Sequence, residues 1–105
     1  MCRIKTCFLD QLNYESFENV KSEFGDVKFD LIIDDGLHSI GSNYNTLLYA
    51  LNHINTGGWI VIEDIYKGHK NNWFSICFNI KQKSNLKTFL INTKSSYMFC
   101  VNKMD

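Results

Sequence analysis

The sequence contains no proline, and it shows no internal repeat, linker or low-complexity segment. Because 105 residues is the length of one small domain, we expect a single domain that spans the whole chain. No apolar run approaches the roughly 18 residues that a membrane-spanning helix requires. The first residues, Met-Cys-Arg-Ile-Lys, lack the apolar core of a signal peptide. These absences predict a cytoplasmic protein without a membrane partner.

Net charge and cysteine spacing exclude further classes of protein. The 11 basic and 11 acidic residues cancel, so no excess of positive charge indicates a nucleic-acid partner. The four cysteines form no Cys-x-x-Cys pair, which gives no support to a four-cysteine zinc site. We therefore expect Cys2, Cys7, Cys77 and Cys100 to be buried, reduced and structural.

The spacing of apolar residues predicts an alternation of strands and helices. The predicted strands are Arg3–Leu9, Phe29–Asp34, Trp59–Glu63, Leu86–Ile91 and Tyr97–Val101, and the predicted helices are Tyr14–Phe24, Ser42–Ile54 and Trp73–Lys81. The turns Gly25-Asp26 and Thr56-Gly57-Gly58 are expected to end the first two helices. The resulting order, β-α-β-α-β-α-β-β with a final hairpin, predicts an α/β three-layer sandwich.

Two of the predicted strands end abruptly in acidic residues. Asp34 and Asp35 follow one apolar run, with His38 three residues later, and Glu63 and Asp64 follow the next. Because a strand–helix–strand crossover makes both strands parallel, the two acidic pairs should meet at one edge of the sheet. Carboxylates crowded in this way repel one another unless a cation or proton offsets their charge. The pattern therefore indicates a site for a cation or a shared proton, although each acidic pair alone is also typical of a solvated loop or helix cap.

These motifs resemble those of class I S-adenosylmethionine-dependent methyltransferases, and more narrowly the magnesium-dependent macrolide-sugar O-methyltransferase and cephalosporin-hydroxylase-like family. That family has an apolar strand, Asp-Asp-Gly-Ser-His, a helix, a Gly-Gly turn and an apolar strand that ends in Glu-Asp. This chain carries the pattern at 33–38, 57–58 and 62–64, with Leu37 in place of the serine. An apolar strand with two aspartates also resembles a Walker B strand, but no Gly-x-x-x-x-Gly-Lys precedes it.

The resemblance implies a role for five residues. Asp35, Glu63 and Asp64 would hold Mg²⁺, and His38 would act as the general base on a hydroxyl of a sugar-like small molecule. Asp10 weakly matches the acidic residue that contacts the adenine ring of S-adenosylmethionine. Hard oxygen ligands suit magnesium, and an imidazole suits proton transfer near neutral pH, so the chemistry of these residue types agrees with the roles.

The sequence also departs from this family, because the first strand of the methyltransferase fold and its Gly-x-Gly-x-Gly turn are absent. None of the six glycines forms that turn. The implied architecture is therefore a partial Rossmann-like fold, an incomplete domain that corresponds to the C-terminal half of the enzyme. The missing strand normally pairs with Phe29–Asp34, which leaves that strand with an open edge. Two hypotheses follow: an O-methyltransferase or its C-terminal part, or a non-catalytic module that acts with a missing N-terminal half or a second copy of itself.

Overall fold

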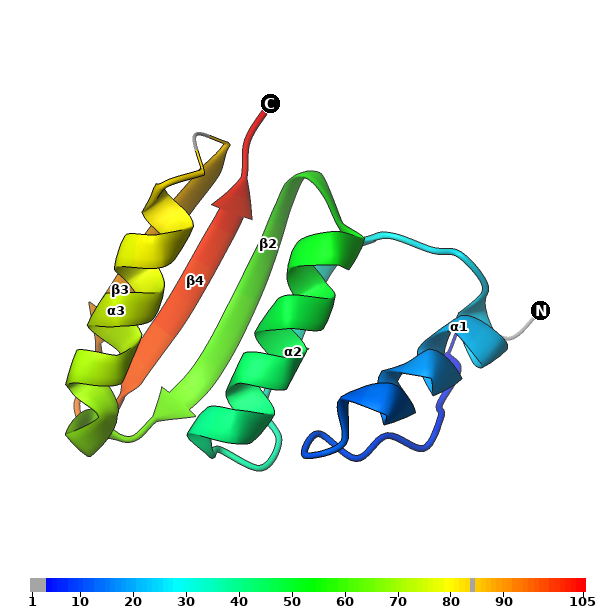
Figure 1. Ribbon diagram of the computed structural model, residues 1–105, viewed down its shortest axis with the longest axis horizontal. Helices are drawn as coiled ribbons and strands as arrows, with labels where there is room; N and C mark the ends of the chain where they lie inside the picture. Colours follow the sequence, from blue (N-terminus) through cyan, green and yellow to red (C-terminus); the bar gives the residue numbers. More distant parts are fainter. Residues whose placement is uncertain (1–3, 84) are drawn as a thin grey trace.

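The computed structural model describes residues 4–83 and 85–105 and shows a mixed four-stranded sheet in the order β1-β2-β4-β3 (Figure 1). The strands are β1 (Phe29–Asp34), β2 (Ile54–Ile65), β3 (Leu86–Asn92) and β4 (Tyr97–Lys103), and the helices are η1 (Tyr14–Phe17), α1 (Glu18–Phe24), α2 (Ile40–His53), η2 (Lys67–His69) and α3 (Lys70–Lys81). β1 and β2 are parallel, whereas β4 runs antiparallel to both of its neighbours. This is the predicted mixed α/β fold, with a parallel pair followed by an antiparallel hairpin.

The β1–α2–β2 unit that was predicted to place the acidic residues is confirmed. Ile33 pairs with Val61, and Asp34 pairs with Ile62, so both strands reach the same edge of the sheet. Ser39 caps α2: its side chain accepts a hydrogen bond from the backbone N–H of Ser42, and the Ser42 side chain returns the contact. A capping box of this kind fixes where the helix begins, and it therefore also sets the length of the loop at residues 35–39.

Several boundaries differ from the predictions, most clearly around Gly57-Gly58 and at the start of α3. Helix α2 ends at His53 and β2 begins at once at Ile54, so Gly57 and Gly58 lie inside the strand and do not end the helix. Gly58 allows a close approach, because a Cβ there would lie 2.9 Å from the Asp30 backbone oxygen. Helix α3 starts at Lys70, three residues before the predicted start.

The predicted first strand is wrong in the part that the structure describes, because residues 4–9 form neither strand nor helix. An extended segment becomes a strand only when a neighbouring strand accepts its hydrogen bonds, and β1, β2, β4 and β3 are the only sheet members among the described residues. The side chain of Phe8 is 76% exposed. Cys2 and Arg3 lie outside the described residues.

One hydrophobic core joins both long helices to a single face of the sheet. Leu47 and Ala50 of α2, and Trp73 and Ile80 of α3, pack on buried side chains of β2 and β4. Figure 1 shows α2 and α3 on the same side of the sheet. The described residues therefore supply the sheet and one helical layer of the three-layer sandwich.

The face of the sheet opposite the helices and the β1 edge expose apolar side chains in the described part of the chain. β1 is the terminal strand of the sheet, and its Leu31 and Ile33 are each 54% exposed. Trp59 and Ile91, on other strands, are also exposed. An uncovered apolar strand edge is a site for pairing with another strand, as the sequence predicted for Phe29–Asp34.

The three described cysteines are free, but they are not equally buried. Cys100 is buried, Cys77 is half-buried and Cys7 is exposed, so the expectation of burial is wrong for Cys7. Burial raises the pKa of the Cys100 thiol and is also the main cause of the raised pKa of Cys77. Both thiols are thus held in the protonated, less reactive form. No helix within residues 4–83 and 85–105 is long and apolar enough to span a membrane.

Candidate functional site

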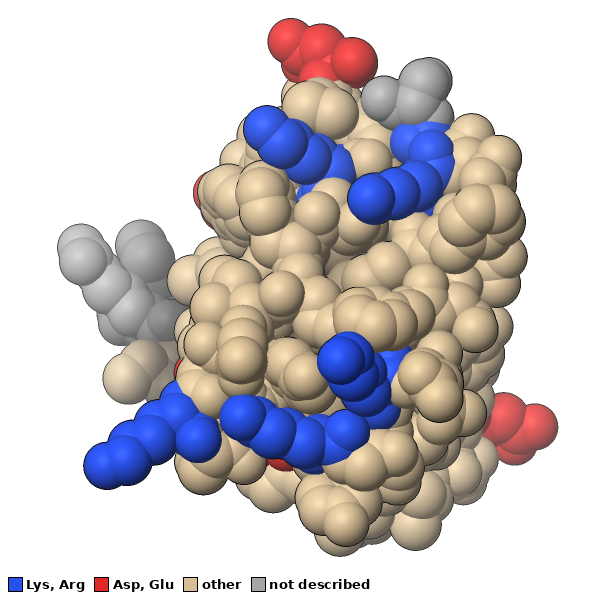
Figure 2. Space-filling view, turned by 90° about the vertical axis from the view of Figure 1, so that its left-hand side faces the viewer, with Lys and Arg blue, Asp and Glu red and all other residues tan. Residues whose placement is uncertain are grey.

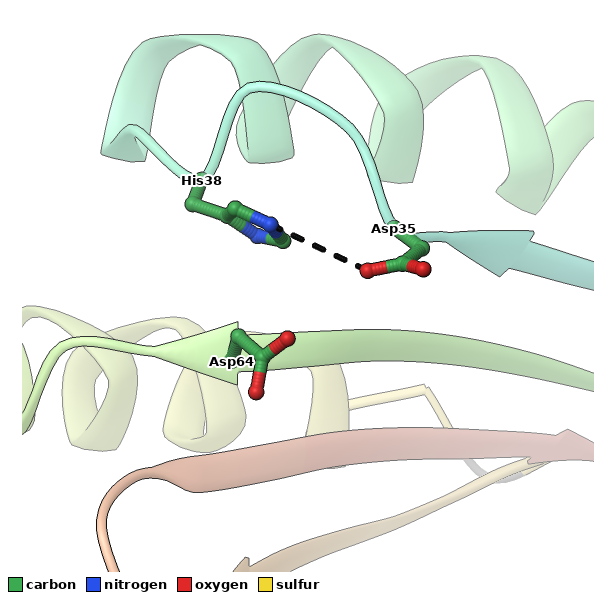
Figure 3. Close-up of side chains that lie close together, drawn as sticks. All are labelled: Asp35, His38 and Asp64. Atoms are coloured by element: carbon green, nitrogen blue, oxygen red, sulfur yellow. Dashed lines mark ion pairs between the residues drawn. The ribbon is translucent and has the colours of Figure 1, made fainter.

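The loop that follows β1 carries Asp35 and His38, and the helix cap behind it holds both in place. Nε2 of His38 lies 3.8 Å from Oδ1 of Asp35, and their side chains are 38% and 64% exposed. His38 has a φ of 60°, in the left-handed region that residues other than glycine rarely adopt. Strained backbone is concentrated at binding and catalytic sites, and here it orients the imidazole towards Asp35 (Figure 3).

Asp64 reaches the same place from the end of β2 through an irregularity in the sheet. The pairing of β2 with β4 shifts between Ile62 and Ile65, as in a β-bulge, and Asp64 has a φ of 56°. A bulge redirects a side chain from the face that strict alternation would give it. Asp64 and His38 are the only described residues other than glycine with positive φ, and both belong to this site.

Asp35, His38 and Asp64 form one cluster at the carboxyl edge of the parallel strands. Ligand atoms of the three side chains all lie within 4.8 Å of one another. Figure 3 shows Asp35 and His38 on the loop after β1, across from Asp64 at the end of β2. All three are exposed, so water reaches the cluster, and a ligand could enter it without a change of fold.

The structure does not bring the other two predicted site residues into this cluster. Glu63 is half-buried and lies outside the cluster, although it belongs with Asp64 to the segment in which the pairing of β2 with β4 shifts. Asp10 is exposed, and its Oδ1 accepts a hydrogen bond of 3.0 Å from the backbone N–H of Leu12. The carboxylate of Asp10 thus stabilises a turn that leads towards η1.

Asp34 has a different role from its neighbour Asp35, because it is only 3% exposed. Its Oδ1 accepts hydrogen bonds from Nε2 of Gln11 at 3.0 Å and from the backbone N–H of Gly36 at 3.1 Å. Its Oδ2 accepts one from Nδ2 of Asn43 at 2.8 Å. A buried carboxylate is tolerated when donors satisfy both oxygens, so Asp34 ties the loop to the start of α2.

Gln11 completes this polar network from the N-terminal side. Its Nε2 also donates to Oγ1 of Thr46, and its Oε1 accepts from the backbone N–H of Leu37 at 2.9 Å. A Cβ at Gly36 would collide with the Gln11 side chain, so a larger residue there would displace Gln11 from this network. Sequence reasoning did not identify the partners of Asp34, because Gln11 and Asn43 belong to other elements and form no recognisable motif with it.

We expect Asp34→Asn to lower the free energy of unfolding by about 1–3 kcal/mol, because the new amide must face at least one buried donor. Asn43→Asp alone should also destabilise, because it places two carboxylates side by side. The double variant Asp34→Asn/Asn43→Asp exchanges donor and acceptor and should recover much of the loss. Urea unfolding of the four proteins measures the coupling; a double variant no better than the sum of its parts would contradict the network.

A groove runs along the open edge of β1 and ends at the loop of the cluster. Its volume is about 560 Å³, and Leu9, Phe17, Val20, Leu31 and Ile33 provide much of its apolar lining, with Asp35 and Gly36 at one end. Ligands of open α/β sheets bind outside the carboxyl ends of the strands. The position of the groove, beside the acidic cluster, therefore suits a ligand or chain segment that must reach Asp35.

Comparisons with known proteins identify the fold. No protein-family model matches the chain, and no curated protein matches it by sequence. Among solved structures, MycE methyltransferase from the mycinamycin biosynthetic pathway superimposes with a TM-score of 0.70 over 97% of this chain, at 20% sequence identity. MycE was solved with Mg and SAH, and also with Mg, SAH and mycinamycin VI.

Two further structures have the same fold at lower similarity. SMU.1697c from Streptococcus mutans, in complex with SAH, has a TM-score of 0.53 over 74% of this chain at 13% identity. An rRNA methylase from Streptococcus thermophilus has a TM-score of 0.54 over 84% at 14% identity. This chain spans 33% of MycE and 52% and 54% of the other two proteins. It therefore has the fold of part of these methyltransferases.

Proposed function

We propose that this chain is the metal-binding and acceptor-binding part of an S-adenosylmethionine-dependent O-methyltransferase whose acceptor is a hydroxyl of a sugar-like small molecule. The observation that carries this proposal is the convergence of Asp35, His38 and Asp64 at the carboxyl edge of β1 and β2. The fold likeness to MycE, which was solved with Mg and SAH, supports it.

The donor set of the cluster fits a divalent cation. Two ligands of one Mg²⁺ ion, each about 2.1 Å from it, lie at most about 4.2 Å apart. The ligand atoms of the cluster lie within 4.8 Å of one another, so small rotamer changes would bring the carboxylates of Asp35 and Asp64 to that spacing. Glu63 would join them as the third carboxylate only if its side chain turned towards this edge. A bound Mg²⁺ would supply the positive charge that lowers the pKa of a nearby hydroxyl.

His38 is the residue that we propose as the general base. Its imidazole would take the proton of the acceptor hydroxyl, and the oxygen would then attack the methyl carbon of S-adenosylmethionine. S-adenosylmethionine, when bound, would supply that methyl group, and its sulfur would keep the electron pair of the broken carbon–sulfur bond as S-adenosylhomocysteine. Asp35, 3.8 Å from the imidazole, would stabilise the imidazolium that forms and would keep the ring directed at the site.

The chain alone should not bind S-adenosylmethionine, because it lacks the glycine turn whose backbone approaches the methionine portion of the cofactor in related enzymes. Calorimetry with S-adenosylmethionine tests this expectation directly, and micromolar binding to the 105-residue chain would contradict it. A polypeptide segment that carries the glycine turn would restore binding. Sequencing the genomic region around this coding sequence would reveal such a segment, which can then be produced together with this chain and assayed for methyl transfer to sugar hydroxyls.

The second candidate function is a non-catalytic module that associates through the edge of β1. The exposed Leu31 and Ile33 on a terminal strand favour it, because apolar strand edges pair with other strands. One complex distinguishes the two candidates: this chain together with a segment that carries the glycine turn. If that complex neither transfers a methyl group nor binds Mg²⁺, the non-catalytic module is favoured.

A further inference from the structure

The net charge of zero conceals a division of charge along the chain. Residues 66–105 contain seven lysines and one acidic residue, Asp105, whereas residues 1–65 contain ten acidic residues and four basic ones. The expectation of no nucleic-acid partner depended on the sum over the whole chain. A charge asymmetry of this size between two parts of a protein is typical of a surface for an anionic partner.

The fold gathers these lysines on the side of the molecule formed by α3 and β3, which we call the lysine side. Figure 2 views it directly and shows the basic side chains in two groups, with an uncharged band between them. Lys67, Lys70 and Lys94 lie near the carboxyl end of β2. Lys67 and Lys70 follow that strand in the chain, and Lys94 lies in the turn before Tyr97, which pairs with Ile65 of β2. Lys81, Lys83 and Lys87 lie towards the opposite end of α3, where β3 begins.

Two phenylalanines of α3 occupy the stretch between the groups. Phe74 is 49% exposed and Phe78 is 66% exposed. Lys70, Phe74, Phe78 and Lys81 follow one another at intervals of four, four and three residues. Their side chains therefore share one face of the helix. Nζ of Lys70 lies 5.4 Å from the centre of the Phe74 ring. Exposed rings beside lysines can stack on flat ligands while the lysines bind phosphate.

We propose that the lysine side binds a single-stranded nucleic acid. Lys70 and Lys81 are separated by about 16 Å along the helix axis, at a rise of about 1.5 Å per residue. A linear polyanion can contact both groups of lysines at once, whereas one small phosphate compound cannot. The phosphates would lie on the lysines, and the bases would stack on Phe74 and Phe78. This proposal is independent of methyl transfer.

The residues that surround the two rings favour a nucleic acid over an anionic membrane. A helix that lies in a membrane surface buries a wide apolar face in the lipid, but Trp73 and Ile80 of α3 are already buried against the sheet. The outward positions beside Phe74 and Phe78 carry Asn71, Asn72, Ser75 and Asn79, all exposed. Amide and hydroxyl groups can hydrogen-bond to bases and sugars, and they are costly to place in hydrocarbon.

The test is fluorescence anisotropy of the full chain with a labelled oligouridine of about 20 nucleotides, longer than the sites of many single-strand-binding modules. We expect binding that weakens as salt is added. Phe74→Ala/Phe78→Ala removes no charge and alters exposed positions, so its circular dichroism should match that of the native chain. We expect this variant to lose affinity by about tenfold or more, because each stacked base contributes substantially.

A matched pair of charge variants separates the lysine side from charge in general. Lys81→Gln/Lys83→Gln/Lys87→Gln should weaken binding and make it less dependent on salt. Lys5→Gln/Lys21→Gln/Lys28→Gln removes the same charge from the other part of the chain and should change affinity little. Equal losses in the two triple variants would overturn the proposal, and so would an unchanged affinity in the phenylalanine variant.

Two further probes decide between partners. A duplex RNA of the same length should bind more weakly than the single strand, because its bases are not available for stacking. Vesicles that contain phosphatidylserine should bind weakly and without dependence on Phe74 and Phe78. Phenylalanine-dependent binding to vesicles, with none to the oligouridine, would overturn the proposal in favour of a membrane surface.

Discussion

Replacing His38 should lower turnover by about 10²–10⁴ in an enzyme completed by the cofactor-binding segment, which is the usual contribution of a positioned general base. The appropriate substitution is His38→Asn, because His38 has a φ of 60° and asparagine adopts that backbone conformation more readily than alanine. The change then removes the imidazole without adding strain to the loop. Affinity for Mg²⁺ should change little, since His38 is proposed as the base and not as a ligand.

The pH dependence of the rate supplies a second measurement for His38. A general base accepts a proton only in its unprotonated form, so the pH–rate profile of the native enzyme should show a rise that depends on the presence of the base. That rise should be absent in His38→Asn. His53→Asn is a control, because His53 does not belong to the cluster. Its Nδ1 lies 2.7 Å from the backbone oxygen of Tyr49, within α2. If His38→Asn kept the full rate and the same pH dependence, His38 would not be the base.

Removing either carboxylate of the cluster should weaken metal binding and activity together. We expect Asp35→Asn and Asp64→Asn each to weaken Mg²⁺ binding by at least about tenfold. Loss of a residue that only supports a metal ligand lowers metal affinity by about 10–100-fold, and loss of the ligand itself should lower it more. Mn²⁺ titration followed by the relaxation of water protons measures affinity in the isolated chain. Methyl transfer in the completed enzyme measures the consequence for the reaction.

Two control variants make the metal experiment specific. Asp30→Asn removes a carboxylate from the other end of β1, where Asp30 accepts a hydrogen bond from Asn55, and it should leave metal affinity unchanged. Glu63→Gln tests whether Glu63 is a metal ligand. The resemblance predicts that this variant loses metal affinity, whereas the position of Glu63 outside the cluster predicts little change. Unchanged binding in both Asp35→Asn and Asp64→Asn would remove the metal from the proposal.

The regular elements near the site could be predicted because local periodicity determines them. The boundaries of β1 are those predicted from an apolar run between Lys28 and the acidic pair. α2 and the β3–β4 hairpin were predicted with errors of a few residues at their ends. Two parallel strands joined by a helix then had to bring Asp35 and the Glu63-Asp64 pair to one edge.

Other features depended on neighbours that the local sequence does not specify. Residues 4–9 have the pattern of a strand but no strand beside them among the described residues, so the pattern alone gave the wrong answer there. Gly57-Gly58 is typical of a helix end, yet both glycines lie inside β2, where Gly58 passes close to the backbone of Asp30. Whole-chain charge likewise concealed the lysine side, which required counting by segment.

The sequence by itself determined that acidic residues and a histidine would meet at the carboxyl edge of a parallel pair of strands, because strand ends and crossover handedness follow from local pattern. The tertiary structure decided which of those residues meet. A shift in the pairing of β2 with β4 directs Asp64, and not Glu63, towards His38, and burial makes Asp34 a structural partner of Gln11 and Asn43. Both outcomes depend on contacts between segments far apart in the chain, and such contacts leave no periodic signal in the sequence.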